Sequence, residues 1–215
     1  MINESDFVFI NFIGKILQTG KIFDLNYKDL AEKEGIKSEN MKFEPILVVP
    51  NAKYTLSVIS KSVVGKEVGD KYTLDIKPKE GFGDFNPKLV RTFSLNTFME
   101  NRINPSVGDV VALDDKIATV MSVSGGRVMV NFNHPLAGKD LRYEIEIIKK
   151  IESDNDKCDA IFTHYVGSKP QSVEISGNNI KIAYSGDVQK YVADAISTDI
   201  VKYINKEFKV EITKS

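Results

Sequence analysis

The stretch VNFNHPLAGKDLRYEIEI, residues 130–147, places a turn between two strand-like runs. Apolar and polar residues alternate after the turn, which is typical of a strand with one buried face. Pro135 fixes the backbone of the turn, and His134, one of two histidines in the chain, offers two ring nitrogens to backbone groups. We therefore interpret His134 as a residue that orders a loop rather than as a catalyst.

Upstream of this turn, the first half of the chain is predicted to form strands separated by glycine and proline turns. Residues 7–13 are largely apolar on both alternating sets, as in a strand covered on both faces. The turn QTGK separates this run from IFDLN, and Asn26 can cap a short helix that ends at Gly35. Further strands are expected in FEPILVVP and VGDKYTLDIKP. Residues 1 to about 86 are therefore predicted to form one twisted antiparallel sheet.

Three blocks of sequence occur in the order VFINFIGKI…TGKIFD, VGKEVGDKYTLDIKPKEGFGD and VNFNHPLAGKDLRYEIEI. In this order they resemble the FKBP-type peptidyl-prolyl cis-trans isomerases, in their SlyD-like and archaeal long-type branch. The third block is the most specific, because it matches the family pattern DFNHPLAGK followed by Leu, Phe, Val and Val at alternate positions. The resemblance spans most of residues 6–150. It implies an α+β fold with an FKBP-like twisted antiparallel half-barrel and a short helix.

An insertion of about 45 residues separates the second block from the third, and its pattern is that of a small, mostly β domain. Ser94 can cap a helix, three strands follow, and SGGR is a turn. The resemblance identifies this segment as an insert-in-flap domain, which binds unfolded polypeptide. We expect the polypeptide-binding side chains among its apolar residues, although each of them could instead belong to the core. These are Phe93, Leu95, Phe98, Met99, Val110, Val128 and Met129.

After residue 152 the character of the sequence changes. A charged linker is predicted at ESDNDK, and strands are predicted at SVEIS, NNIKIAYS and FKVEITK. An amphipathic helix is predicted over residues 187–206. A β-β-α-β domain is predicted, and the resemblance implies a role in homodimerisation or partner binding. The expected domains are an isomerase domain over 1–86 and 133–152, the insert over 87–132, and a C-terminal α/β domain over 153–215.

The resemblance also implies a catalytic pocket. Its expected members are Phe12, Phe23, Asp24, Ile46, Leu56, Ile59, Phe82 and Tyr143, with Asp24 at the rim and the N–H of Leu56 holding the substrate carbonyl. For the apolar members the alternative is ordinary core. Several positions depart from the family pattern, including Ile59, Ser60 and Lys66 in the segment TLSVISKSVVGKEVG. Phe12 and Phe82 replace tyrosines, and Val58 replaces a glycine whose left-handed conformation, if the family has one there, would strain a valine.

Two functions remain open. In the first, the insert captures unfolded polypeptide and the pocket isomerises X-Pro bonds, because an apolar enclosure disfavours the planar, charge-separated imide relative to the twisted transition state. In the second, the pocket is degenerate and the protein is an ATP-independent holding chaperone. The partners expected in both cases are unfolded or proline-containing polypeptides.

Composition excludes several other classes. A formal net charge of −1, from 29 basic and 30 acidic residues, gives no general reason to expect nucleic acid or an anionic membrane as a partner. No secretory signal or membrane-length apolar run is visible. The single cysteine, Cys158, allows neither an internal disulfide nor a zinc site. We expect a cytoplasmic protein without a metal, a cofactor or a nucleotide-binding loop.

Overall fold

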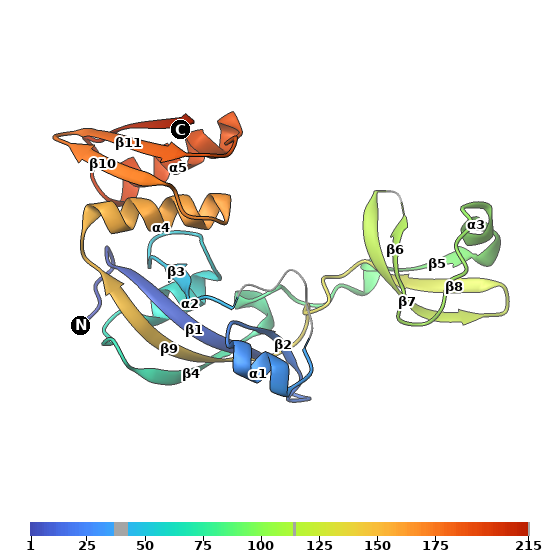
Figure 1. Ribbon diagram of the computed structural model, residues 1–215. Helices are drawn as coiled ribbons and strands as arrows, with labels where there is room; N and C mark the ends of the chain where they lie inside the picture. Colours follow the sequence, from blue (N-terminus) through green and yellow to red (C-terminus); the bar gives the residue numbers. More distant parts are fainter. Residues whose placement is uncertain (37–42, 114, 215) are drawn as a thin grey trace. The chain divides into compact units, whose positions relative to one another are not determined.

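The computed structural model describes residues 1–36, 43–113 and 115–214. These residues form two compact units, and Figure 1 shows their elements. The first unit contains Met1–Ile76 and Leu141–Ser215, and the second contains Lys77–Asp140. The chain therefore leaves the first unit once and returns to it once.

The first unit is built on an antiparallel sheet with the strand order β2-β1-β9-β4, and β3 also pairs with β1. β1 is central, and it pairs with β9 along its whole length, from Phe7 opposite Ile151 to Ile16 opposite Leu141. The antiparallel sheet predicted from the sequence is confirmed. Its strands are β1 (Phe7–Ile16), β2 (Ile22–Leu25), β3 (Ile46–Val48), β4 (Lys71–Ile76) and β9 (Leu141–Ile151).

Two short helices accompany this sheet, α1 (Lys28–Lys33) and α2 (Ser57–Ser62). The prediction that Asn26 caps α1 is wrong, because Tyr27 is the N-cap residue. The side chain of Asn26 is instead 4% exposed and bonds to the backbone of the neighbouring strand. A buried amide that satisfies buried backbone groups stabilises the fold more than an exposed cap would.

The second unit is a four-stranded antiparallel sheet of order β5-β8-β7-β6 with one helix, α3. The side chain of Ser94 accepts a hydrogen bond from the N–H of Asn96 and caps α3, as predicted. Phe98 of α3 is fully buried among the inward-facing side chains of the sheet. The elements of this unit are 3-10 turns at Pro78–Glu80 and Pro87–Leu89, β5 (Val90–Ser94), α3 (Leu95–Glu100), β6 (Val110–Leu113), β7 (Lys116–Ser124) and β8 (Arg127–Asn131).

The C-terminal region contains a helix that the sequence did not reveal. The prediction of a linker over ESDNDK is wrong, because Asp154–Val166 form α4, capped by Ser153, whose side chain accepts from the N–H of Asp156. Acidic residues favour the first turn of a helix, and here they were mistaken for a linker. The region is therefore α-β-β-α-β, with α4, β10 (Ser172–Ser176), β11 (Asn179–Tyr184), α5 (Lys190–Tyr203) and β12 (Lys209–Lys214).

Helix α4 lies between the two sheets of the first unit (Figure 1). Cys158, Ile161 and Phe162 of α4 share one hydrophobic core with Phe7 of β1 and Leu47 of β3. The other side of α4 packs with α5 and with β10 to β12, of which β11 and β12 are parallel. The C-terminal region thus packs directly on the five-stranded sheet. Among the helices in the described ranges, none has the length and apolar character needed to cross a membrane.

Candidate active site

A cavity of about 270 Å3 opens in the first unit beside the antiparallel sheet. It brings together Phe12, Asp24, Ile46, Ile59 and Tyr143, all of which the sequence assigned to the pocket. They come from β1, β2, β3, α2 and β9. The complete lining is Ile10, Phe12, Asp24, Ile46, Leu47, Tyr54, Thr55, Ile59, Tyr143 and His164.

Three aromatic rings pack together here: Phe12 and Tyr143, which line the cavity, and Phe23, which does not line it. The ring centroid of Tyr143 lies 5.7 Å from that of Phe12 and 5.7 Å from that of Phe23. Phe23 reaches Tyr143 by packing on Gly14 of β1, where an added Cβ would lie 2.8 Å from the Cζ of Phe23. Gly14 also pairs with both Asp24 and Tyr143 in the sheet. The absence of a side chain at this position therefore makes room for the aromatic group.

Asp24 and Tyr143 share this poorly hydrated environment. Burial raises the pKa of Asp24, whereas a backbone hydrogen bond from Leu25 lowers it, and the effect of burial is the larger. Burial also raises the pKa of Tyr143, and the charge of Asp24 raises it further. Both shifts have desolvation as their largest cause, which indicates that the cavity holds polar groups in mostly apolar surroundings. Tyr143 therefore keeps its proton at neutral pH.

The segment that precedes α2 forms another wall. Leu56 is the half-buried N-cap residue of α2, its carbonyl accepts a hydrogen bond from the N–H of Ser60, and its neighbour Thr55 lines the cavity. Val58 lies within α2, where the right-handed helical backbone accepts a valine. The strain considered for a valine in a left-handed position does not arise here.

Phe82 and His134 belong to the second unit. Their rings are stacked with centroids 4.4 Å apart and an interplanar angle of 2°. The Nδ1 of His134 accepts a hydrogen bond from the N–H of Leu136 at 3.1 Å, and its carbonyl accepts from the N–H of Ala137. His134 therefore orders the loop, as the sequence indicated. The N–H of Gly138 donates to the carbonyl of Gly83, which joins this loop to the one that carries Phe82.

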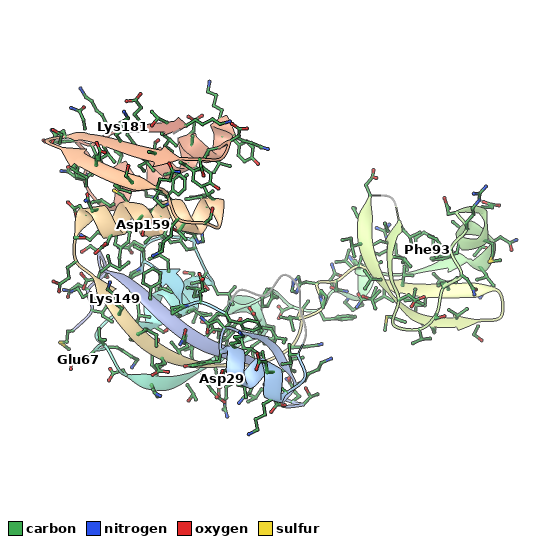
Figure 2. All side chains as sticks on the ribbon, in the orientation of Figure 1. Asp29, Glu67, Phe93, Lys149, Asp159 and Lys181 are labelled. Atoms are coloured by element: carbon green, nitrogen blue, oxygen red, sulfur yellow. The ribbon has the colours of Figure 1, made fainter. Side chains whose placement is uncertain are left out.

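The apolar residues expected to bind polypeptide divide into core and surface. Phe98 and Val128 are fully buried in the core of the second unit, and Leu95 and Met129 are half-buried. Phe93, which Figure 2 labels, is also half-buried. Its ring centroid lies 6.4 Å from that of Phe98. Met99 and Val110 are the exposed members of the predicted set, at 56% and 70%.

An exposed apolar face on β6 and β7 was missed by the sequence reasoning. Val110 pairs with Thr119, and Ala112 pairs with Ile117, so these four side chains lie on one face of the sheet. Ile117 is 73% exposed. The alternation of buried Val111 and Leu113 with exposed Val110 and Ala112 was the available signal.

Sequence reasoning did not place five of the lining residues in the pocket, namely Ile10, Leu47, Tyr54, Thr55 and His164. His164 lies on α4, a helix that was not predicted and whose first turn was taken for a linker. The described residues contain no group of three or more His, Cys, Asp or Glu side chains that could hold a metal ion.

Comparison with known proteins gives relatives of both units. The family model described as FKBP26, IF domain, matches residues 94–136. A short-type peptidyl-prolyl cis-trans isomerase of Methanocaldococcus jannaschii is 26% identical over 68% of this chain and 92% of its own length. An FKBP-type 16 kDa peptidyl-prolyl cis-trans isomerase of Escherichia coli is 31% identical over 42% of this chain and 64% of its own length. The Haemophilus influenzae FKBP-type peptidyl-prolyl cis-trans isomerase SlyD is 30% identical over 44% of this chain and 52% of its own length.

Proposed function

We propose that the chain belongs to the FKBP-type peptidyl-prolyl cis-trans isomerase family, to whose members it is similar, and that it isomerises X-Pro bonds in the cavity of the first unit. The observation that carries the proposal is the convergence of Phe12, Asp24, Ile59 and Tyr143 on one cavity from separate elements. Phe23 supports this cavity by its contact with Tyr143. Leu56, which precedes α2 and does not line the cavity itself, would act at its edge.

The proposed catalysis needs no covalent step. The planar X-Pro imide is stabilised by charge separation between its oxygen and nitrogen, and rotation to the twisted form costs roughly 18–20 kcal/mol. Water stabilises the planar form, so an apolar cavity lowers the barrier by removing that water. The proline ring would lie against Phe12 and Tyr143, while the backbone N–H of Leu56 would hold the preceding carbonyl.

A protease-free assay of cis-to-trans isomerisation tests this proposal. Asp24→Ala removes the half-buried carboxylate and leaves space for water in the cavity, so we expect the catalytic efficiency to fall by about tenfold or more, or about 1.4 kcal/mol. The matched control is Asp29→Ala, because Asp29 is an exposed carboxylate on α1 (Figure 2). Equal activity of both variants would place catalysis elsewhere.

We also propose that the second unit captures unfolded polypeptide. The exposed face that contains Val110, Ala112 and Ile117 supports this, because exposed apolar side chains on one sheet face offer a surface for other apolar chains. Met99 supplies a further exposed and adaptable contact. Captured segments would then meet the isomerase cavity at high effective concentration.

Lysines on this face give a test. Val110→Lys with Ile117→Lys should keep the fold, because both side chains are exposed, and should reduce the suppression of aggregation of an unfolded protein. Isomerisation of a short peptide should be unchanged. The control is Val68→Lys with Tyr191→Lys, which replaces exposed apolar residues of the first unit. If the unaltered chain suppresses aggregation without accelerating isomerisation, the holding-chaperone alternative holds and the isomerase proposal fails.

A homodimer through the C-terminal region is the last part of this proposal. The outer face of its sheet is polar, with Lys181 opposite both Glu174 and Glu211 and pointing outward (Figure 2). Pairing would therefore use the edge strands β10 or β12 rather than this face. Light scattering should give twice the chain mass of 24.0 kDa, and the mass of one chain at all concentrations would contradict the dimer.

A further inference from the structure

One wall of the candidate active site comes from the C-terminal region. Of the residues that line the cavity, His164 lies on α4, whereas the others belong to the sheet, to α2 or to the loop before α2. Cys158, Ile161 and Phe162 anchor the buried side of α4 in the shared core. His164 itself is exposed to solvent although it lines the cavity, and its ring centroid lies 4.4 Å from that of Tyr54.

The C-terminal helices also hold Tyr54 in place. The hydroxyl of Tyr54 donates to Oδ2 of Asp199 on α5 at 2.9 Å, and the hydroxyl of Tyr165 donates to the same oxygen at 2.6 Å. The ring of Tyr203 lies 6.2 Å from that of Tyr54, and its hydroxyl donates to the carbonyl of Asn51. Helices α4 and α5 therefore fix the loop that leads to the proposed carbonyl-binding residue Leu56.

The chemistry of this wall differs from that of the apolar bowl, which is the part of the cavity lined by Phe12 and Tyr143. Partial desolvation lowers the pKa of His164, whereas the charge of Asp199 raises it. The net shift is downward, so the ring is mostly neutral at neutral pH. The other titratable groups around it are Tyr54 and Tyr165, which contact its ring, and Asp24 and Tyr143, which line the same cavity. His164 thus presents a neutral, flat surface in a cavity whose lining contains one carboxylate.

We infer that α4 completes the substrate cavity and that His164 is a specificity-determining residue, which contacts the side chain beside the substrate proline. This inference rests on the isomerase activity proposed above. Once the proline ring fills the apolar bowl between Phe12 and Tyr143, the neighbouring side chain must leave the bowl along the remaining lining. Apart from Asp24, the polar residues of that remaining lining are Tyr54, Thr55 and His164. Its contacts, rather than those of the bowl, would then discriminate between substrates.

A change of charge at position 164 tests this contact directly. The full chain is assayed at neutral pH with three peptides that differ only in the residue before proline, which is alanine, lysine or glutamate. His164→Lys should favour the glutamate peptide over the lysine peptide, and His164→Glu should reverse that preference. We expect each ratio of catalytic efficiencies to shift by about fivefold, which is the effect of one unit charge at close range across a partly solvated gap.

Matched variants separate substrate contact from damage to the fold. Asn155→Lys and Asn155→Glu introduce the same charges at an exposed position of α4 that does not line the cavity, and they should leave the ratios unchanged. His164→Gln keeps a neutral polar side chain and should retain the ratios of the unaltered chain. Each ratio is taken within one protein, so partial unfolding lowers both rates without changing it.

The outcomes are distinct. Opposite shifts for His164→Lys and His164→Glu, with constant ratios for both Asn155 variants, support the inference. Constant ratios in active His164 variants overturn it and leave the proposed isomerase function intact. If the His164 and Asn155 variants shift the ratios equally, the effect is long-range electrostatics and the inference is also overturned. Absence of catalysis in the unaltered chain refutes the isomerase function and this inference together.

Discussion

Truncation of Asn26 is the sharpest test of how the candidate site is held. Its Oδ1 accepts a hydrogen bond from the N–H of Phe12 at 2.8 Å, and its Nδ2 donates to the carbonyls of Ile10 at 3.2 Å and Glu44 at 2.9 Å. Phe12 and Ile10 both line the cavity. Asn26→Ala should therefore destabilise the first unit and lower isomerase activity at the same time.

The magnitude follows from burial. The N–H of Phe12 and the carbonyl of Ile10 lose their bonds to Asn26 in buried settings, whereas the carbonyl of Glu44 is only part-buried and water can reach it. A buried polar group left without a partner costs about 1–3 kcal/mol. We expect Asn26→Ala to lower the free energy of unfolding by about 3–4 kcal/mol, the middle of the range for two such groups.

The assay is urea unfolding of the full chain followed by circular dichroism, since the sequence contains no tryptophan. Hydrogen exchange of the Phe12 amide reports the same loss locally. The matched control is Asn51→Ala, because the Nδ2 of Asn51 makes an exposed bond to the carbonyl of Glu4 and should contribute no more than about 0.5 kcal/mol. A loss below about 1 kcal/mol for Asn26→Ala, with unchanged protection of the Phe12 amide, would refute this reasoning.

Three further predictions concern a carboxylate, a thiol and a glycine. Burial raises the pKa of Asp24 above its usual 3.8, so the folded state binds this proton more tightly and stability falls as the pH rises through that interval. Asp24→Asn should therefore be more stable than the unaltered chain in urea at pH 7 but not at pH 3, and an equal difference at both would contradict this. Burial raises the pKa of Cys158 to about 12, so iodoacetamide should label it only on unfolding, and immediate labelling of the native chain would refute this. Gly138 has a φ of 74°, and an added Cβ would lie 2.7 Å from the Cβ of Phe85. Gly138→Ala should therefore destabilise the second unit by about 1–3 kcal/mol in urea unfolding. Unchanged stability would exclude that contact.

The sheets could be predicted from sequence because their signals are local. β1 has largely apolar residues on both alternating sets, which correctly indicated a central strand, although one of its faces is buried and the other is only partly covered. The cap of α3 at Ser94 was equally readable, because a serine before a helix needs only its own backbone. Asn26 carries the same type of signal, yet its side chain bonds to a strand that lies 14 residues away in sequence. No local pattern distinguishes these two uses of a polar side chain.

Helix α4 was missed for a related reason. Its first turn, Asp154–Lys157, is polar because it starts a capped helix, and its buried residues Cys158, Ala160, Ile161 and Phe162 are not confined to a narrow stripe. A helix packed between two layers needs apolar residues on more than one side, so the amphipathic spacing expected of a surface helix is weak. His164 could be assigned to the cavity only after this helix was placed.

The aromatic composition of the pocket bears on the choice between an active and a degenerate site. The family pattern has a tyrosine at the position of Phe12 and a phenylalanine at the position of Tyr143, whereas this chain has the reverse. The two ring centroids are 5.7 Å apart, so the exchange moves a hydroxyl between neighbouring strands without removing it from the cavity. The charge of Asp24 helps to keep this hydroxyl protonated. Tyr54 and Thr55 add further hydroxyl-bearing side chains to the lining. The substitution at Phe12 is therefore weak support for a degenerate pocket, because a hydroxyl on a neighbouring ring remains in the cavity.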